Sequence, residues 1–249
     1  MIKLSDNITH EYNFTSAIVS RLCREGNSNF GYRRLYEFMK PEVRDNHYHI
    51  IQVPKKSGGS REVSTPFGEL KYIQTCIAEM LTDAYEPEPG VQGFARGKSV
   101  ITNALGYLCD DYILNINIRN FFPSITDKMV LDALVISEMG IKVPQMISAL
   151  CTWTEQRTDD LPEQVLPQGA PTSPILSDIV CQTMDRRLNG LAIRFGLKYS
   201  RYADDITFSS QYSVYLNDSD FWQELKCIFD WRGFSINENK THLLKSCSR

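Results

Sequence analysis

Hydrophobic spacing divides the first half of the chain into a helical start, a hairpin and a second helical stretch. Residues 1–45 are expected to be mostly helical and carry no recognisable chemistry. His49–Val53 is typical of a strand, and the turn residues after it predict a return strand at Arg61–Ser64. Apolar residues recur at helical spacing from Leu70. They are Ile73, Ile77, Met80 and Leu81.

Residues 112–118 alternate as the residues of a half-buried strand do. The apolar face carries Leu114, Ile116 and Ile118. The opposite face carries Asn115 and Asn117. Because successive side chains of a strand point to opposite faces, this segment should place one apolar and one polar face on a sheet.

Two helices are expected after this strand. Thr126 can cap a helix that runs to about Glu138. Ser173 and Pro174 begin another, because proline is tolerated at the first helical position. The buried stripe of that second helix is Ile175, Leu176, Ile179, Val180, Met184 and Leu188.

The last part of the chain completes an α+β arrangement. Residues 197–209 predict two short strands joined through Ala203-Asp204-Asp205. A helix over about 221–231 should end at Gly233, and Phe234–Ile236 should begin a last strand. This order predicts a split βαβ (ferredoxin-like) antiparallel sheet with helices on one face, which brings two strand ends side by side.

Composition is that of an ordinary globular protein. The 249 residues can bury one substantial core or two small lobes that share a cleft, and 42% are hydrophobic and 23% charged. No apolar run reaches the length of a membrane span, and the start of the chain lacks the apolar region of a signal peptide. We therefore expect a cytoplasmic protein with no membrane contact.

Cysteine usage and net charge add little to this picture. The seven cysteines form no CxxC pair and have no histidine at zinc-ligand spacing, so we expect them to be reduced and mostly buried. A formal charge of −3 argues weakly against nucleic-acid binding. However, Lys55, Lys56 and Arg61 cluster in one short segment. Charge alone therefore does not exclude a nucleic-acid partner.

The turn Tyr202-Ala203-Asp204-Asp205 carries the clearest chemical signal. Adjacent carboxylates at a tight turn between apolar strands repel each other, and a divalent cation removes that cost. Hard oxygen ligands of this kind suit Mg²⁺. A solvated turn is the plain alternative, since aspartate is common in turns. Other segments of the chain have to decide between the two.

Six short blocks, this turn among them, follow one another in a defined order. They are 54–62 (PKKSGGSRE), 93–99 (GFARGKS) with Asn103-Ala104, 117–125 (NIRNFFPSI), 166–174 (LPQGAPTSP), 202–205 (YADD) and 233–237 (GFSIN) with Lys240-Thr241. Together they resemble the ordered blocks of bacterial reverse transcriptases, and most closely those of the retron type. The resemblance spans about residues 50–245.

The resemblance implies the fingers and palm of a right-hand polymerase. Residues 1–45 would form an N-terminal helical region, 46–110 the first part of the fingers and 111–249 the palm, with a fingers insertion around 140–170. Retron enzymes continue into a helical thumb that grips the primer–template duplex. We expect the thumb to be absent from this chain and synthesis to be weak and distributive, because phosphate contacts dominate affinity.

The implied activity is RNA-directed DNA synthesis with Mg²⁺ as cofactor. Its substrates would be deoxynucleoside triphosphates, and its template a structured non-coding RNA that carries the nascent DNA. Retron enzymes act in defence against phage, often with an effector protein. The expected partners are therefore the RNA, the nascent DNA, the triphosphates and an effector.

Four residues outside the turn are assigned to the nucleotide by the same resemblance. Lys55 and Arg61 would face the triphosphate, and an exposed basic turn is the alternative. Gln168 and Gly169 would line the floor of the nucleotide pocket.

Three further segments have weaker assignments. Phe122 matches the family's steric gate against a 2′-hydroxyl, although we expect one of Phe121 and Phe122 to be core. Lys240 matches a lysine proposed to protonate the leaving pyrophosphate, with a solvated lysine as the alternative. The loop Gly93–Ser99 would let backbone approach a template strand.

One expected metal-binding carboxylate is missing. The resemblance implies that Asp204 and Asp205 hold Mg²⁺ together with a third residue, which is an aspartate in the family and Asn117 in this chain. It also assigns Ile118, the next residue, to the metal and nucleotide sites. An amide offers one neutral oxygen in place of a carboxylate, so affinity for two metal ions should fall. Asp111 lies roughly 20 Å away along an extended strand, and it cannot substitute. Asp127, beyond the Phe-Phe-Pro turn, does not reach either.

The chain as written is therefore expected to be impaired or inactive in DNA synthesis while keeping its nucleotide and nucleic-acid surfaces. An Asp-to-Asn change made to trap a complex would explain Asn117, and so would a naturally non-catalytic member. Tyr107 is a second departure, since the family has a histidine there. Two other hypotheses stay open: a reverse transcriptase of a group II intron or another defence system, and a non-catalytic RNA-binding scaffold that regulates an effector.

Overall fold

The computed structural model describes part of the chain, which falls into two compact units. The described residues are 8–24, 29–54, 58–155, 162–213, 215 and 219–245. The first unit comprises Met1–Tyr85 with Ile125–Val180, and the second comprises Glu86–Ser124 with Cys181–Arg249. The helix α8 (Ser173–Arg194) begins in the first unit and ends in the second.

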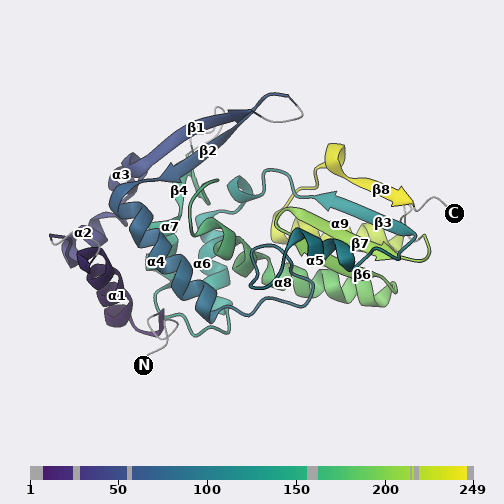
Figure 1. Cartoon of the computed structure of the whole chain (residues 1–249), viewed down its shortest axis with the longest axis horizontal. Helices are drawn as coiled ribbons and strands as arrows, with labels where there is room; N and C mark the ends of the chain where they lie inside the picture. The colour runs from purple at the N-terminus through teal and green to yellow at the C-terminus, as the bar shows by residue number, and fades with distance from the viewer. Residues whose placement is uncertain are drawn as a thin grey trace. The chain divides into compact units, whose positions relative to one another are not determined.

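The first unit combines helices with two antiparallel hairpins (Figure 1). Its helices are α1 (Glu11–Arg24), α2 (Tyr32–Glu37), α3 (Pro41–Arg44), η2 (Asp45–His47), α4 (Gly68–Ala84), α6 (Asp127–Ile136) and α7 (Pro144–Cys151). Its hairpins are β1 (Tyr48–Pro54) with β2 (Ser60–Pro66), and β4 (Trp153–Glu155) with β5 (Glu163–Val165). The first hairpin and the helix predicted from Leu70 are confirmed, and so is the helical start for the residues among 1–45 that the structure describes. Residues 1–7 and 25–28 of that prediction lie outside them.

The helix α6 begins as the sequence predicts. Thr126 is its N-cap, and the Thr126 hydroxyl accepts a hydrogen bond from the N–H of Met129 at 3.2 Å. The helix ends at Ile136, slightly short of the predicted Glu138, because Ser137 already has extended backbone angles.

The second unit is built on a four-stranded antiparallel sheet in the order β6-β7-β3-β8 (Figure 1). Its strands are β3 (Tyr112–Asn117), β6 (Lys198–Tyr202), β7 (Asp205–Ser210) and β8 (His242–Lys245). Along the chain, α8 precedes β6, and α9 (Asp220–Arg232) precedes β8. This connectivity is that of the split βαβ fold, so the predicted fold class is confirmed.

One face of the sheet packs against α8 and α9. Phe208 of β7 is fully buried, and its ring centroid lies 5.2 Å from that of Phe221 on α9 and 5.5 Å from that of Tyr199 on β6. Ser200 pairs with Thr207 in the next register position. Strand alternation therefore directs the aromatic pair to the helices and the hydroxyl pair to the opposite face.

A short helix, α5 (Val100–Leu105), lies beside β6 on this opposite face, where no helix was predicted. A capping box starts it. The Ser99 hydroxyl accepts from the N–H of Thr102 at 3.2 Å, and the Thr102 hydroxyl accepts from the N–H of Ser99 at 2.8 Å. The two long helices α8 and α9 thus share one face of the sheet, and the short helix α5 lies against the other.

The last strand begins later than predicted. Ile236 makes a single bridge to Ile118, and the chain then turns through η4 (Glu238–Lys240) before β8. The N–H of Asn237 donates to the carbonyl of Asn117 at 2.8 Å, and the N–H of Arg119 donates to the carbonyl of Ser235 at 2.9 Å. These two hydrogen bonds form that bridge. Phe234–Ile236 is thus linked to the end of β3 by one bridge and is not part of β8.

Two expectations from composition bear on the described residues. Six of the cysteines lie there, and none of them is joined to another described residue by a disulfide. Cys76, Cys151 and Cys181 are buried, Cys23 is half-buried, and Cys109 and Cys227 are exposed. The prediction that most are buried therefore holds for only half of them. Within the described residues, no helix has both the length and the apolarity that a membrane span requires.

Phe208→Ala should lower the free energy of unfolding by about 3–5 kcal/mol, because it leaves a cavity among buried aromatic rings. Urea unfolding followed by tryptophan fluorescence measures the change. Leu105→Ala, at a side chain that is 60% exposed, is the control, and it should change stability by less than about 0.5 kcal/mol. Equal losses for the two variants would contradict the packing of this face.

Candidate active site

The two adjacent carboxylates lie where the β6–β7 hairpin meets the end of β3. Asp204 is in the turn, and Asp205 is the first residue of β7. Asp205 pairs across the sheet with Asn117, the last residue of β3. The N–H of Ile118 donates to the carbonyl of Asp204 at 2.8 Å. The antiparallel register thus brings together predicted site residues that lie far apart in the sequence.

Asn117 cross-links the two carboxylates. Its Nδ2 donates to Asp204 Oδ2 at 2.7 Å and to Asp205 Oδ1 at 2.8 Å. Ionised carboxylates only accept hydrogen bonds, so the amide has to turn its NH₂ group, and not its oxygen, toward them. Asn237 fixes this orientation, because its Nδ2 donates to Asn117 Oδ1 at 3.3 Å.

The pKa of Asp205 reflects this arrangement. Loss of hydration raises the pKa of Asp205, the hydrogen bond from Asn117 lowers it, and the charge of Asp204 raises it again. The charges of Lys240 and His242 act in the lowering direction. The net shift of the pKa is upward, as expected for two like charges held side by side at a partly dehydrated turn.

The donor set fits a divalent cation only in part. Two carboxylates suit Mg²⁺, but the amide of Asn117 directs its N–H donors toward both of them. A cation bound to the same oxygens would have to displace that amide. Among the residues that the structure describes, no group of three or more His, Cys, Asp and Glu side chains could hold a metal ion. The carboxylate pair therefore lacks a third acidic ligand.

Strained backbone is concentrated in the segments that form this site. Among the described residues, the non-glycine positions with left-handed backbone are Ala203, Phe94 and Asn120, with φ of 55°, 58° and 48°. Each costs about 1–3 kcal/mol and persists only where the surroundings hold it. Such a concentration is typical of functional sites.

Gly93 packs directly on the Tyr-Ala-Asp-Asp turn. A Cβ atom at this position would lie 2.5 Å from the backbone nitrogen of Ala203 and 3.1 Å from the carbonyl carbon of Tyr202. The N–H groups of Gln92 and Gly93 both donate to the carbonyl of Arg201, at 2.8 and 3.3 Å. The sequence suggested a template contact for this glycine, and the contact with the turn was not predicted.

Comparison with known proteins agrees with this geometry. Residues 53–248 match the family described as reverse transcriptase (RNA-dependent DNA polymerase). The chain belongs to the reverse transcriptase family.

Its relatives include retron enzymes, which confirms the resemblance to that type. The chain is 33% identical over 226 residues to the Retron Mx65 reverse transcriptase of Myxococcus xanthus, and 32% identical over 200 residues to the Retron Ec86 reverse transcriptase of Escherichia coli. These matches cover 86% and 79% of this chain. They cover 52% and 59% of the relatives, so the chain spans little more than half of their length.

A solved structure supports the predicted fingers-and-palm fold. Apo telomerase from Candida tropicalis, truncated from its C-terminal domain, aligns with a TM-score of 0.53 at 13% sequence identity. The alignment covers 83% of this chain and 51% of the telomerase chain. At this identity the likeness shows the fold alone.

The two phenylalanines of the reverse transcriptase block have different environments. Phe121 is 5% exposed, and its ring centroid lies 6.1 Å from that of Phe234. Phe122 is half-buried, and its ring centroid lies 6.5 Å from that of Phe94. One of the pair is core, as predicted, and the role of Phe122 as a steric gate stays a prediction.

Ile118 and Lys240 differ in what they can offer a ligand. The side chain of Ile118 is buried, so only its backbone could take part in a metal or nucleotide site. Lys240 is exposed on η4, and its charge acts on the pKa of Asp205. Both assignments stay predictions.

The predicted nucleotide pocket residues Gln168 and Gly169 pack against β2 within the first unit. The N–H of Ser64 donates to the carbonyl of Gln168 at 2.8 Å. Gly169 has a φ of 128°, and a Cβ there would lie 2.8 Å from a β2 side chain. The same strand carries the exposed Arg61. Lys55 lies outside the described residues, and the joint action of these residues on a nucleotide stays a prediction.

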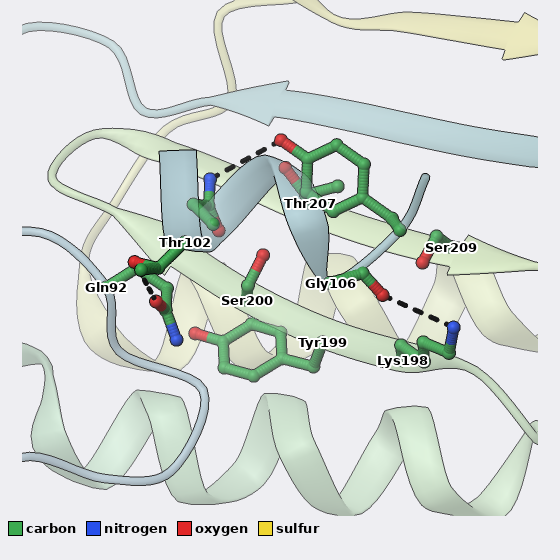
Figure 2. A pocket seen from close by; sticks show the side chains of 10 residues that line it. Gln92, Thr102, Gly106, Lys198, Tyr199, Ser200, Thr207 and Ser209 are labelled. Carbon is green, nitrogen blue, oxygen red and sulfur yellow. Dashed lines mark hydrogen bonds between the residues drawn. The ribbon is translucent and has the colours of Figure 1, made fainter. Parts of the chain in front are cut away.

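A polar pocket of about 220 Å³ lies between α5 and the strands β6 and β7 (Figure 2). The Lys198 ammonium donates to the carbonyl of Gly106 at 3.3 Å, as Figure 2 shows. Tyr107 lines this pocket, and its hydroxyl lies 3.5 Å from Asn103 Nδ2. The buried oxygens Asn103 Oδ1 and Ser200 Oγ have no hydrogen-bond partner among the described residues. The departure from the family at Tyr107 therefore falls in this pocket.

A buried ion pair next to the turn was not predicted from the sequence. Arg201, the residue before Tyr202, is paired with Asp185 of α8, and neither side chain is exposed. Asp185 follows Met184 and precedes Leu188 in the apolar stripe of α8. A charged residue between buried apolar ones was the signal that could have revealed the pair.

Gly93→Ala should lower the free energy of unfolding by about 1–3 kcal/mol, because the added methyl meets backbone and not a flexible side chain. Urea unfolding measures the loss. Gly190→Ala is the control, since a Cβ at this helical position meets nothing within 4 Å. The control should gain about 0.5–1 kcal/mol from helix propensity, and a gain of stability in both variants would contradict the contact with Ala203.

Proposed function

We propose that this reverse transcriptase adds deoxynucleotides to the 3′ end of a primer on an RNA template. The observation that carries the proposal is the placement of Asp204 and Asp205 side by side, opposite Asn117, at the edge of a split βαβ sheet. Family membership supports the same reaction.

The described residues suit separate parts of this reaction. Asp204 and Asp205 would hold Mg²⁺, which supplies activation of the primer 3′-hydroxyl and charge neutralisation at the leaving pyrophosphate. Lys240 is exposed beside Asp205 and is suited to donate a proton to the pyrophosphate. Phe122, whose ring contacts Phe94, is suited to exclude a 2′-hydroxyl.

Asn117 should impair this reaction in the chain as written. Its amide donates to both carboxylates, so binding of a cation requires the loss of two hydrogen bonds and supplies no negative charge in return. Each charge-assisted hydrogen bond of this kind contributes about 1.5–3 kcal/mol. The affinity for Mg²⁺ is therefore much lower than with an aspartate at this position.

The partners follow from the relatives and are part of the proposal. The named relatives are retron reverse transcriptases. We infer that the template is a structured non-coding RNA and that the substrates are deoxynucleoside triphosphates. We further infer that the protein acts in defence against phage together with an effector protein.

A second candidate function is that of a non-catalytic, RNA-binding member of the family. The observation in its favour is the Asn117 amide, which stabilises the carboxylate pair without a metal ion. In that case the fold would serve to bind RNA and to regulate an effector.

Asn117→Asp should raise Mg²⁺-dependent primer extension on an RNA template by roughly a hundredfold or more, comparable to restoring one electrostatic group of an active site. Asn117→Asp combined with Asp204→Asn should abolish that gain, because one carboxylate is lost again. RNA binding is measured in parallel for all three chains. RNA binding without extension by any of them would favour the non-catalytic function.

Asn117→Asp should also make stability depend on Mg²⁺. Three adjacent carboxylates destabilise the metal-free fold, and Mg²⁺ at a hundredfold its Kd adds about 2.7 kcal/mol. That gain corresponds to roughly 5–10 °C in melting temperature for a chain of this size.

Differential scanning calorimetry with and without Mg²⁺ measures this shift. Asn115→Asp is the matched control, since Asn115 lies on the same face of β3 but is bonded to Thr207 and not to the carboxylate pair. Equal Mg²⁺ shifts for the two variants would contradict a specific site at Asn117.

A further inference from the structure

We propose that Asp185 and Arg201 are positioning residues that hold Ala203 in its left-handed conformation and so keep Asp204 and Asp205 side by side. The inference rests on the proposed function in one respect, since it assigns these carboxylates to metal binding. It adds two residues that belong to none of the reverse transcriptase blocks recognised in the sequence.

The ion pair is built as a fork. Arg201 Nε donates to Asp185 Oδ1 at 2.7 Å, and Arg201 Nη2 donates to Asp185 Oδ2 at 2.8 Å. Both side chains are 0% exposed. The hydroxyl of Tyr199 donates to the same carboxylate, and burial raises the pKa of Tyr199 well above its usual value, which keeps the hydroxyl a donor. The guanidinium plane is therefore held from α8 in one orientation.

The remaining arm of the guanidinium reaches the turn. Arg201 Nη1 donates to the carbonyl of Ala203 at 3.2 Å. Ala203 has a φ of 55°, a conformation that a residue with a Cβ adopts only when the surroundings impose it. Gly93 packs on the same residue, since a Cβ there would lie 2.5 Å from the Ala203 nitrogen. The turn is thus held at its carbonyl by Arg201 and at its nitrogen by Gly93.

The orientation of Ala203 decides where the carboxylates point. Asp204 follows Ala203 directly, and its carbonyl is fixed by the N–H of Ile118 at 2.8 Å. A change at Ala203 would rotate Asp204 relative to Asp205, which is anchored in β7. A buried pair that only stabilised the core would not need a bond to the turn.

Arg201→Lys separates positioning from simple stability. An ammonium group cannot reproduce the planar fork, so it can satisfy Asp185 or the Ala203 carbonyl but not both with the same geometry. In the Asn117→Asp background, we expect the Mn²⁺ affinity, measured by electron paramagnetic resonance, to fall roughly tenfold. A tenfold change in affinity matches the smallest free-energy cost expected for one residue in a left-handed conformation.

Ala203→Gly provides the rescue. Glycine adopts positive φ without strain, so the turn can form without help from the guanidinium. Adding Ala203→Gly to Arg201→Lys should restore most of the Mn²⁺ affinity while the urea stability stays low. Absence of this rescue, or an unchanged Mn²⁺ affinity in Arg201→Lys, would overturn the proposal.

Arg44→Lys is the matched control. Arg44 is also 0% exposed, and it bonds to Asp45 and to the carbonyl of Ala149 in the first unit. The variant should lose stability without a change in Mn²⁺ affinity, and Ala203→Gly should restore nothing in it. If Arg44→Lys weakens Mn²⁺ binding as Arg201→Lys does, the effect is one of stability and the proposal fails.

A measurement without metal tests the positioning role separately from the proposed metal site. In the unaltered chain labelled with ¹³C-alanine, the Ala203 Cα resonance is assigned by its loss in Ala203→Gly. It should move away from its left-handed value in Arg201→Lys, or in the milder Tyr199→Phe if the lysine variant does not fold. If Asn117→Asp binds no Mn²⁺, the proposed metal site fails. In that case the Ala203 Cα resonance alone tests the positioning role: a shift supports the role, and an unchanged resonance overturns it.

Discussion

Repulsion between two adjacent carboxylates is the constraint on which the rest of this site depends. Asp204 and Asp205 are neighbours in sequence and lie on a turn whose alanine is strained, so the fold has to compensate both charge and strain. In this chain a protein side chain offsets the charge repulsion, because the amide of Asn117 donates to both carboxylates. A neutral donor reduces the repulsion without a metal ion, and for the same reason it opposes the binding of one.

The sheet order brings the residues that relieve this repulsion to the carboxylate pair. In β6-β7-β3-β8, the hairpin that carries the carboxylates is hydrogen-bonded to the strand that ends at Asn117. Asn237, in the segment before β8, completes the set by bonding to Asn117. Antiparallel pairing therefore places three chain segments at one edge, and the aromatic packing on the opposite side of the hairpin holds the strands in that register.

Support of the turn comes from residues that are not assigned to metal or nucleotide binding. The segment around Gly93 covers one side of the turn, and α8 contributes Asp185 from a helix that is otherwise packed by apolar residues. The carboxylate turn is one of six blocks by which this sequence resembles reverse transcriptases. Arg201 and Gly93 both contact this turn, and a strained backbone persists only where several contacts agree.

The sequence by itself determined most of the elements, the fold class, the family and the candidate carboxylates, because periodicity, capping residues and short blocks are local properties. It also showed that Asn117 replaces an expected aspartate. It did not predict the helix α5. Only the tertiary structure decided that Asn117 donates to both carboxylates, that Gly93 touches Ala203 and that Arg201 pairs with Asp185. The reason is that each of these contacts joins residues far apart in the chain, and their distance depends on sheet register and helix packing, which no local pattern encodes.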